Sequence, residues 1–249
     1  MLSQNKIKYL TTLQSKKFRQ KYAIFLAEGD KICLEIIKND KIKIEEIFAL
    51  PNWIEKNIES LKPFRDRLIE ISEAELKKIS CLTTPNQVLI SAHIPSFEID
   101  KELINNDLSF YLDGIQDPGN MGTILRTADW FGIKNVFCSD TCVDIFNPKV
   151  IQASMGAFLR IQSQEIDLQQ LMSEDLPVYG AVLEGENIFE TKLSTKGIIV
   201  IGSEGKGISD TNLSFLTHKI KIPAYGNGAE SLNAAVATGI ICAVFRNSK

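Results

Sequence analysis

Apolar and polar residues alternate along the first part of the chain in patterns that predict a small α/β unit. Apolar positions recur at helical spacing over residues 3–20 and again in "DKICLEIIKN", for which Asp30 is the expected N-cap. Between these segments, "YAIFLAEG" is a compact apolar run typical of a strand. Further strands are expected in "IEEIFAL", "RLIEIS" and "QVLISAHI", and a helix capped by Ser72 in "EAELKKIS". We therefore predict a first domain over residues 1–95.

A more apolar pattern begins after residues 96–107, a polar segment that is predicted to be a linker. Strands are expected in "LSFYLDGI", "NVFCSD", "VYGAVLEG", "GIIVIGSEG" and "KIKIPAYG", and a long helix in "ESLNAAVATGIICAVFRNS". Near-continuous apolar strands are typical of parallel sheets that are covered on both faces. Strands that alternate with helices indicate the same architecture. The second domain, residues 108–249, is thus predicted to be a parallel sheet flanked by helices.

Three glycine-rich turns follow three of the strands expected in this second domain. They are "DGIQDPGNMG", "GSEGKG" and "PAYGNGAE". In parallel sheets, ligands bind beyond the carboxyl ends of the strands, so we expect the three turns to form one site. The second turn is not a phosphate-binding P-loop, because Lys206 is followed by Gly207 rather than by Ser or Thr. Its glycine order also differs from GxGxxG, which argues against a dinucleotide-dependent oxidoreductase.

The first turn runs into a segment with helical spacing, and together they read "DPGNMGTILRTADWFG". Turn-forming residues fill its first half, so we expect a turn there and a helix in the second half. Arg126 lies between Leu125 and Ala128 and is predicted to face inward on that helix. A surface ion pair is the alternative for this cation.

Taken together, the three segments resemble the signature motifs of the SpoU family of RNA ribose 2′-O-methyltransferases, in the SPOUT class. The motifs are "LDGIQDPGNMGTILRTADWFG", "IVIGSEGKGIS" and "IPAYGNGAESLNAAVATGI", and "VDIFNPKVIQASMGAF" resembles the segment between the first two. The likeness covers roughly residues 108–247. The N-terminal "FLAEGDK" and its flanking pattern are similar to the L30e-like substrate-binding domain that is often fused to this family. The resemblance implies a C-terminal α/β domain with a deep trefoil knot, and a homodimer with the long C-terminal helix in its interface.

The resemblance also implies site residues and a cofactor, S-adenosylmethionine. Catalytic roles would fall to Asn120, Arg126, Ser231 and Asn233. The cofactor would be bound by Gly202, Glu204, Gly207, Ile222, Leu232 and Asn233. The family pattern has Met where this chain has Ala224, and Val-Ser where it has Ala234 and Ala235; these departures alter packing or pocket lining and leave the polar residues intact.

The family assigns Arg126 to activating the ribose 2′-hydroxyl group, which the cofactor then methylates. A guanidinium group keeps its proton at neutral pH, which makes it a poor base. An equal alternative is that Arg126 clamps a substrate phosphate and stabilises the developing alkoxide. Asn120 and Ser231 would then hold Arg126 and the ribose in place.

Charge is distributed unevenly between the two predicted domains. The chain has a net charge of −3, but residues 1–95 contain 16 Lys/Arg and 12 Asp/Glu, and the remainder contains 12 and 19. The basic residues that precede the first acidic one are the candidates for RNA contact: Lys6, Lys8, Lys16, Lys17, Arg19 and Lys21. Together with Tyr9, Phe18 and Tyr22, these basic residues are suited to two modes of RNA binding. One is recognition of the shape of a duplex, and the other is stacking on unpaired bases. A solvated helix face is the alternative.

Cysteines and the N-terminus bear on the cell compartment. The five cysteines are scattered, which favours a reducing compartment, and we expect the protein to be cytoplasmic. We expect no metal site, because Cys138 and Cys142 have no second pair and the chain has only two histidines. No apolar run reaches the roughly 18 residues of a membrane span, and residues 1–17 lack the apolar core of a secretory signal.

The sequence therefore predicts an S-adenosylmethionine-dependent 2′-O-methyltransferase whose substrate is ribosomal RNA rather than transfer RNA. Two alternatives stay open. One is a tRNA 2′-O-methyltransferase, and the other is a non-catalytic RNA-binding or ribosome-assembly factor on the same scaffold.

Overall fold

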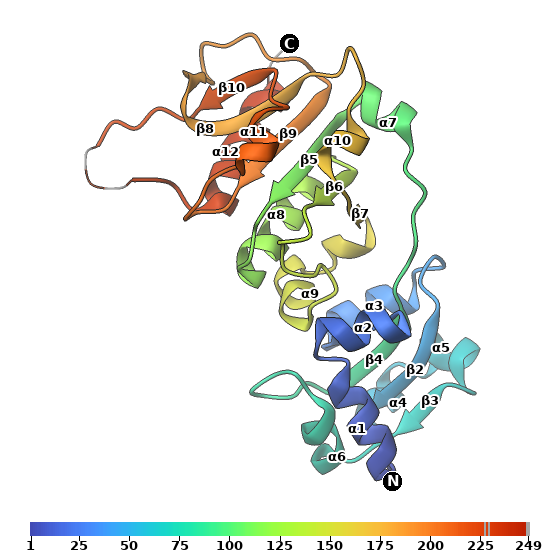
Figure 1. The fold of residues 1–249 in the computed structure, drawn as a ribbon. Helices are drawn as coiled ribbons and strands as arrows, with labels where there is room; N and C mark the ends of the chain where they lie inside the picture. The colour runs from blue at the N-terminus through green and yellow to red at the C-terminus, as the bar shows by residue number, and fades with distance from the viewer. Residues whose placement is uncertain (227, 229, 248–249) are drawn as a thin grey trace. The chain divides into compact units, whose positions relative to one another are not determined.

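The computed structural model describes residues 1–226, 228 and 230–247. Its contacts divide into two compact units. Unit 1 is Met1–Ser96 together with Phe146–Leu159, and unit 2 is Phe97–Ile145 together with Arg160–Lys249. Each unit has its own β-sheet (Figure 1).

Unit 1 is built on a mixed four-stranded sheet. Its strands are β1 (Ile24–Glu28), β2 (Ile44–Ala49), β3 (Leu68–Glu70) and β4 (Val88–His93). They lie in the order β1-β4-β2-β3, with β4 antiparallel to both of its neighbours and β2 parallel to β3. Its helices are α1 (Gln4–Thr12), α2 (Lys16–Tyr22), α3 (Asp30–Ile37), α4 (Pro51–Lys56), α5 (Ile58–Leu61), α6 (Glu73–Ile79) and α9 (Pro148–Ser154), with short 3-10 turns at Lys62–Phe64 and Ala157–Leu159.

The local signals in unit 1 predict its helices with mixed success. Ser72 caps α6 as expected, and Glu75 completes a capping box with it. The expected single helix over residues 3–20 is wrong, because the chain breaks after Leu13 and restarts beyond Ser15. Asp30 is not the N-cap of α3 but its first residue. Gly29 occupies the cap with a φ of 107°, a conformation that favours glycine.

The core of unit 1 includes side chains from the segment Phe146–Leu159. Strand β1 is buried along its whole length, and its Phe25 contacts Phe146 and Phe158, with ring centroids 5.1 and 5.8 Å apart. The side chain of Gln152, on α9, also donates a hydrogen bond to the backbone carbonyl of Glu28. A piece of chain from the second half of the sequence thus completes the N-terminal fold.

Unit 2 is built on a six-stranded sheet in which every neighbouring pair is parallel. The strands are β5 (Leu108–Asp113), β6 (Asn135–Cys138), β7 (Gln162–Glu165), β8 (Val178–Asn187), β9 (Gly197–Gly202) and β10 (His218–Lys221), in the order β10-β8-β9-β5-β6-β7. Its helices are α7 (Lys101–Asn106), α8 (Pro118–Trp130), α10 (Leu168–Leu171), α11 (Asp210–Leu213) and α12 (Ala234–Asn247). The predicted parallel α/β sheet is confirmed, whereas the trefoil knot stays an expectation of the family resemblance.

The segment expected to be a linker, residues 96–107, contains helix α7. Ile104 on this helix is buried in an apolar cluster of unit 2, against which Ile99 also packs. Residues 97–107 therefore belong to unit 2 by their contacts. Across the described residues, no helix is long and apolar enough to cross a membrane.

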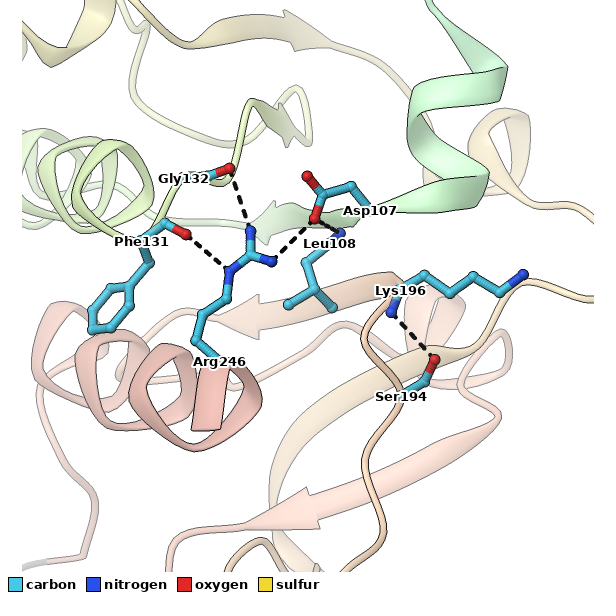
Figure 2. A network of polar contacts seen from close by, with 7 residues as sticks. All are labelled: Asp107, Leu108, Phe131, Gly132, Ser194, Lys196 and Arg246. Atoms are coloured by element: carbon cyan, nitrogen blue, oxygen red, sulfur yellow. Dashed lines mark hydrogen bonds and ion pairs between the residues drawn. The ribbon is translucent and has the colours of Figure 1, made fainter. Parts of the chain in front are cut away.

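Arg246 joins three elements of unit 2 at the end of α12, as Figure 2 shows. Its Nε donates to the carbonyl of Phe131 at 2.8 Å, and Nη2 donates to that of Gly132 at 3.3 Å. These carbonyls lie just past α8, where a helix end leaves acceptors without partners. Its Nη1 pairs with Asp107, directly before β5, at 3.2 Å. Arg246 thus fixes the C-terminal end of α12 against the C-terminal end of α8.

Candidate active site at three glycine-rich turns

The three glycine-rich turns of unit 2 meet through three side chains. Asn120, from the first turn, donates a hydrogen bond from Nδ2 to Glu204 of the second. Asn233, beyond the third turn, donates from Nδ2 to Oδ1 of Asn120 at 2.9 Å. Each group comes from a different predicted motif. The convergence expected from the sequence is therefore confirmed by direct contacts.

Asn120 is positioned by the start of helix α8. Pro118 is the first helical residue, and the Asp117 carboxylate accepts a hydrogen bond from the backbone N–H of Asn120 at 2.8 Å. Asp at the N-cap followed by Pro is a strong helix start. The expected division into a turn and then a helix is thus wrong, since "PGNMG" is already the first turn of the helix. Asn120 extends its amide from that turn.

Arg126 does not face inward, contrary to the expectation. The buried face of α8 contains Met121, Gly122, Ile124, Leu125 and Ala128. Arg126 falls on the opposite stripe, near Thr123, and is exposed. A helix advances by about 100° per residue, so a buried Leu125 turns the next side chain away from the core. Within the part of the chain that the structure describes, Arg126 makes no hydrogen bond or ion pair.

Asn233 serves two elements at once. Its Oδ1 accepts hydrogen bonds from the backbone N–H groups of Ala235 and Val236, at 3.0 and 3.2 Å, which caps α12. Its Nδ2 is the group that reaches Asn120. The expectation that Glu230 and Ser231 begin this helix is wrong, because the helix starts at Ala234. Residues 230–233 instead belong to the turn.

The second turn is held shut by its own backbone and by β5. Ser203 and Gly207 exchange two backbone hydrogen bonds, of 3.1 and 2.9 Å, and Gly207 has a φ of 67°. A side chain on Gly202 would collide with the backbone of Gly207. The Asp113 carboxylate, at the end of β5, accepts from both the N–H and the hydroxyl of Ser209, at 2.8 and 2.7 Å. The second turn is therefore anchored beside the first.

A cavity of about 600 Å³ lies beside the second and third turns. The predicted residues that line it are Gly202, Glu204, Gly207, Ile222, Ser231 and Leu232. Asn120 and Asn233 hold its rim through Glu204 without lining it, and Arg126 does not line it. Ala181–Glu184 form a further wall that was not predicted, although these residues lie within the strand expected at residues 178–185. Three lysines that line the cavity were not predicted either: Lys206, Lys219 and Lys221.

Two titratable groups of unit 2 have shifted pKa values, Tyr111 on β5 and Cys142 in the segment after β6. Burial, reinforced by the charge of Asp113, raises the pKa of Tyr111 to about 12. Hydrogen bonds lower the pKa of the Cys142 thiol to about 7, first that from Cys138, with further contributions from Ser139 and the N–H of Ile115. None of the five cysteines, all of which lie in the described part of the chain, forms a disulfide. The surroundings of Cys142 therefore favour its thiolate form, while those of Tyr111 keep its phenol group neutral.

The residues predicted to contact RNA differ in how accessible they are. Lys8, Lys17 and Lys21 are exposed, and Lys16 is half-buried. Lys6 pairs with Glu46 at 2.8 Å. Arg19 contradicts the expectation: it is 1% exposed, and its Nη1 donates to the carbonyl of Leu13 at 2.8 Å. The break after Leu13 turns Arg19 inward, so it supports the fold rather than an RNA surface.

Aromatic rings lie among these lysines. The ring centroids of Tyr9 and Tyr22 are 5.3 Å apart, and those of Phe18 and Tyr22 are 6.3 Å apart and stacked. The Lys21 ammonium group lies 5.2 Å from the centre of the Tyr22 ring. Tyr22 is exposed, so this cluster offers both a cation and a ring face to solvent.

Comparison with known proteins identifies both units. Residues 107–243 match the model of the SpoU rRNA methylase family, and residues 4–90 match that of the MRM3-like substrate binding domain. The chain is 30% identical to the 23S rRNA (guanosine(2553)-2′-O)-methyltransferase RlmP of Bacillus subtilis, over 95% of this chain and 94% of that one. The chain therefore belongs to the SpoU rRNA methylase family.

Two solved structures share the fold across both units. One, from Porphyromonas gingivalis and assigned to the TrmH family of RNA methyltransferases, is 37% identical with a TM-score of 0.88 over 100% of both chains. The other, an AdoMet-bound rRNA methyltransferase from Sinorhizobium meliloti, is 23% identical with a TM-score of 0.86, over 99% of this chain and 96% of that one. Family membership makes this chain an S-adenosylmethionine-dependent ribose 2′-O-methyltransferase.

The contact between Asn120 and Glu204 yields a test by charge exchange. Asn120→Asp places a second carboxylate against Glu204, and we expect S-adenosylmethionine affinity to fall about tenfold, ~1.4 kcal/mol. Adding Glu204→Gln restores a donor opposite the new carboxylate, so the double variant should recover most of the affinity. Isothermal titration calorimetry measures the wild type, both single variants and the double variant. If the changes in S-adenosylmethionine affinity of the two single variants simply add in the double variant, Asn120 and Glu204 are not coupled and the prediction is wrong.

Proposed function

We propose that the enzyme methylates a ribose 2′-hydroxyl group of ribosomal RNA. Support comes from the Bacillus subtilis relative, whose name gives 23S rRNA as its substrate and which matches nearly the whole of both chains. The match of unit 1 to a substrate-binding domain and the exposed lysines of α1 and α2 favour an RNA ligand on that unit. Transfer RNA is the alternative substrate, and the identity of the methylated RNA separates the two.

We assign the cofactor to the cavity beside the second turn. When bound, S-adenosylmethionine supplies an electrophilic methyl group on a positively charged sulfur. Gly202 and Gly207 let the backbone approach a ligand closely, while Ile222 and Leu232 provide apolar walls. Glu204 contributes a negative charge suited to a cationic ligand. A cavity of about 600 Å³ is within the usual range for small-molecule sites, ~300–1,000 Å³.

Arg126 is assigned to the clamp role rather than to the role of general base. It is exposed, and no hydrogen bond or ion pair engages it within the described part of the chain. A protonated guanidinium group in that state binds a phosphate or a developing alkoxide well and removes a proton poorly. Ser231, exposed at the cavity, is assigned to the ribose. Asn120 already bonds both Asn233 and Glu204, so the role of the two asparagines is to position the turns.

We further propose that the protein is a homodimer that uses the exposed sides of α8 and α12. Trp130 is 85% exposed, and Val236 is 53% exposed. A Cβ added at Gly239 would meet no atom within 4 Å, so packing within the chain does not require glycine there. A second copy against this side would account for the exposed apolar residues and for the small one. The cytoplasm is the proposed compartment, in keeping with five cysteines that form no disulfide among the described residues.

The Arg126→Ala substitution tests the substrate and the clamp together. In cells that lack the gene, the wild-type protein should restore a 2′-O-methyl mark in ribosomal RNA, and Arg126→Ala should not. In vitro, turnover should fall by about 10²–10³, the usual effect of removing one electrostatic stabiliser. Affinity for S-adenosylmethionine should stay within about threefold. Mapping of 2′-O-methyl sites and titration calorimetry provide the measurements.

The matched control for that experiment is Lys134→Ala, which removes another exposed cation of unit 2. It should behave as the wild type. Normal turnover by Arg126→Ala would remove Arg126 from the mechanism. A mark that appears in transfer RNA alone would contradict the proposed substrate.

Reversing the charge of Lys17 and Lys21 tests the basic surface of unit 1. The Lys17→Glu, Lys21→Glu double variant should raise the KM for RNA about tenfold or more, with kcat unchanged. The slope of log KM against log salt concentration should fall by about two, because each phosphate that is no longer bound lowers this slope by about one. Steady-state kinetics over a salt series measures both effects. Lys56→Glu, also exposed, is the control, and an equal response from it would make the effect one of net charge alone.

The proposed dimer is tested by placing a charge on its surface. Trp130→Lys should shift the protein from dimer to monomer in sedimentation velocity runs at micromolar concentration, with an unchanged circular dichroism spectrum. Phe189→Lys is the control, because Phe189 is also exposed but belongs to another part of unit 2. A wild-type protein that sediments as a monomer at every concentration would exclude the proposal.

A further inference from the structure

A second cavity, of about 380 Å³, belongs to unit 1, and none of the residues assigned to methyl transfer lines it. It is lined by Leu26, Glu28, Cys81, Leu82, Pro148, Lys149, Gln152 and Ala153. These residues come from β1, from the loop after α6, and from α9. The volume lies at the lower end of the range for small-molecule sites, ~300–1,000 Å³. The size suits one small planar group rather than a peptide or a helix.

The Glu28 carboxylate organises one wall of this cavity. It is buried, and its two oxygens share the single proton of the Ser80 hydroxyl, at 2.7 and 2.9 Å, and accept from the N–H groups of Cys81 and Asn86 at 3.1 and 3.3 Å. These bonds fasten the loop 80–86 to the end of β1. A carboxylate has about four acceptor sites, so three donors leave it able to accept one more hydrogen bond. That remaining acceptor belongs to a residue that lines the cavity.

The opposite wall is provided by α9. Gln152 uses one N–H for the backbone carbonyl of Glu28, which leaves its side-chain carbonyl oxygen as a second acceptor at the cavity. Leu26, Leu82 and Pro148 supply apolar surface. Lys149 is exposed and brings a positive charge to the rim. The cavity therefore combines apolar walls, hydrogen-bond acceptors inside and a cation outside.

Cys81 has the properties of a neutral wall residue. Burial raises its thiol pKa to about 11, and the charge of Glu28 adds to the effect. The thiol therefore remains protonated at neutral pH. Cys81 is half-buried, whereas the other four cysteines are buried. It is thus the least buried of the five cysteines, and it lies on the cavity wall.

We propose that this cavity binds one unpaired nucleotide of the RNA substrate, with an amino-bearing base inside and its phosphate at Lys149. Sequence-specific recognition of RNA usually takes unstacked bases from loops and bulges and reads their edges. Acceptors at Glu28 and Gln152 match the N–H groups of guanine, adenine or cytosine, and a carboxylate pairs well with an exocyclic amino group. Uracil has no amino group and satisfies the acceptors less well. The positive charge of the unit's N-terminal segment, residues 1–95, favours a polyanion over an uncharged ligand.

This proposal rests on RNA being the substrate, but its test does not depend on methyl transfer. The full-length protein is treated with N-ethylmaleimide, and modification of Cys81 is followed by mass spectrometry. GMP, AMP and CMP should each slow the modification of Cys81 at least threefold at millimolar concentration, and UMP should slow it clearly less. Protection that is equal for all four nucleotides would overturn the base preference. No protection by any nucleotide or by the RNA substrate would overturn the site.

Two variants extend the test to the enzyme. Ala153→Leu fills the cavity and keeps a residue of high helix propensity, and Lys149→Gln removes the rim cation. Each should abolish protection and raise the KM for RNA at least fivefold, while kcat and the affinity for S-adenosylmethionine stay unchanged. Lys31→Gln, an exposed lysine of unit 1 outside the cavity, is the matched control. Wild-type KM in both variants would overturn the proposal, whereas nucleotide protection without any methylation of rRNA would overturn only the proposed substrate.

Discussion

The meeting of the three glycine-rich turns of unit 2 depends on a chain of three side chains, Glu204, Asn120 and Asn233. Each asparagine belongs to the N-terminus of a helix, so their contact sets how α8 and α12 start relative to each other. At the other end of the same two helices, Arg246 donates to the carbonyls that follow α8. Two helices that are joined at both ends must run parallel and in one register. A slip of one residue would separate the amides and open the rim that Glu204 contributes.

This arrangement explains why so few polar groups suffice to assemble the site. The second turn is closed by its own backbone and tied to β5 through Asp113, so it needs only one bond to the first turn. The third turn is fixed where it meets α12, because Asn233 caps that helix. Glycines permit the close approach, since Gly202 has no room for a side chain. The cavity walls are then supplied by whatever residues the turns and β8 present.

The sequence predicts the elements of this protein better than it predicts the direction of individual side chains. Strands such as β5 and β9 follow from local apolar runs, and the meeting of the turns follows from the rule for parallel sheets. Strand β7 was missed because its residues, "QSQE", carry no apolar signal and it pairs with a neighbour on one side only. The burial of Arg19 depends on the helix break after Leu13, and the exposure of Arg126 depends on which face of α8 packs inward. Neither of these is encoded in the spacing of the basic residues themselves.

The exposure of Arg126 is what its proposed clamp role requires. A buried guanidinium group would need permanent partners to offset its desolvation, and those partners would occupy the donors that a phosphate must reach. On the outer stripe of α8 the group stays hydrated and keeps its donors available. Its position is nevertheless defined, because α8 is fixed at its start by Asp117 and Asn120 and at its end by Arg246. In the proposed clamp role, the helix therefore supplies the rigidity and the side chain supplies the charge, and the arginine becomes ordered only when it binds RNA.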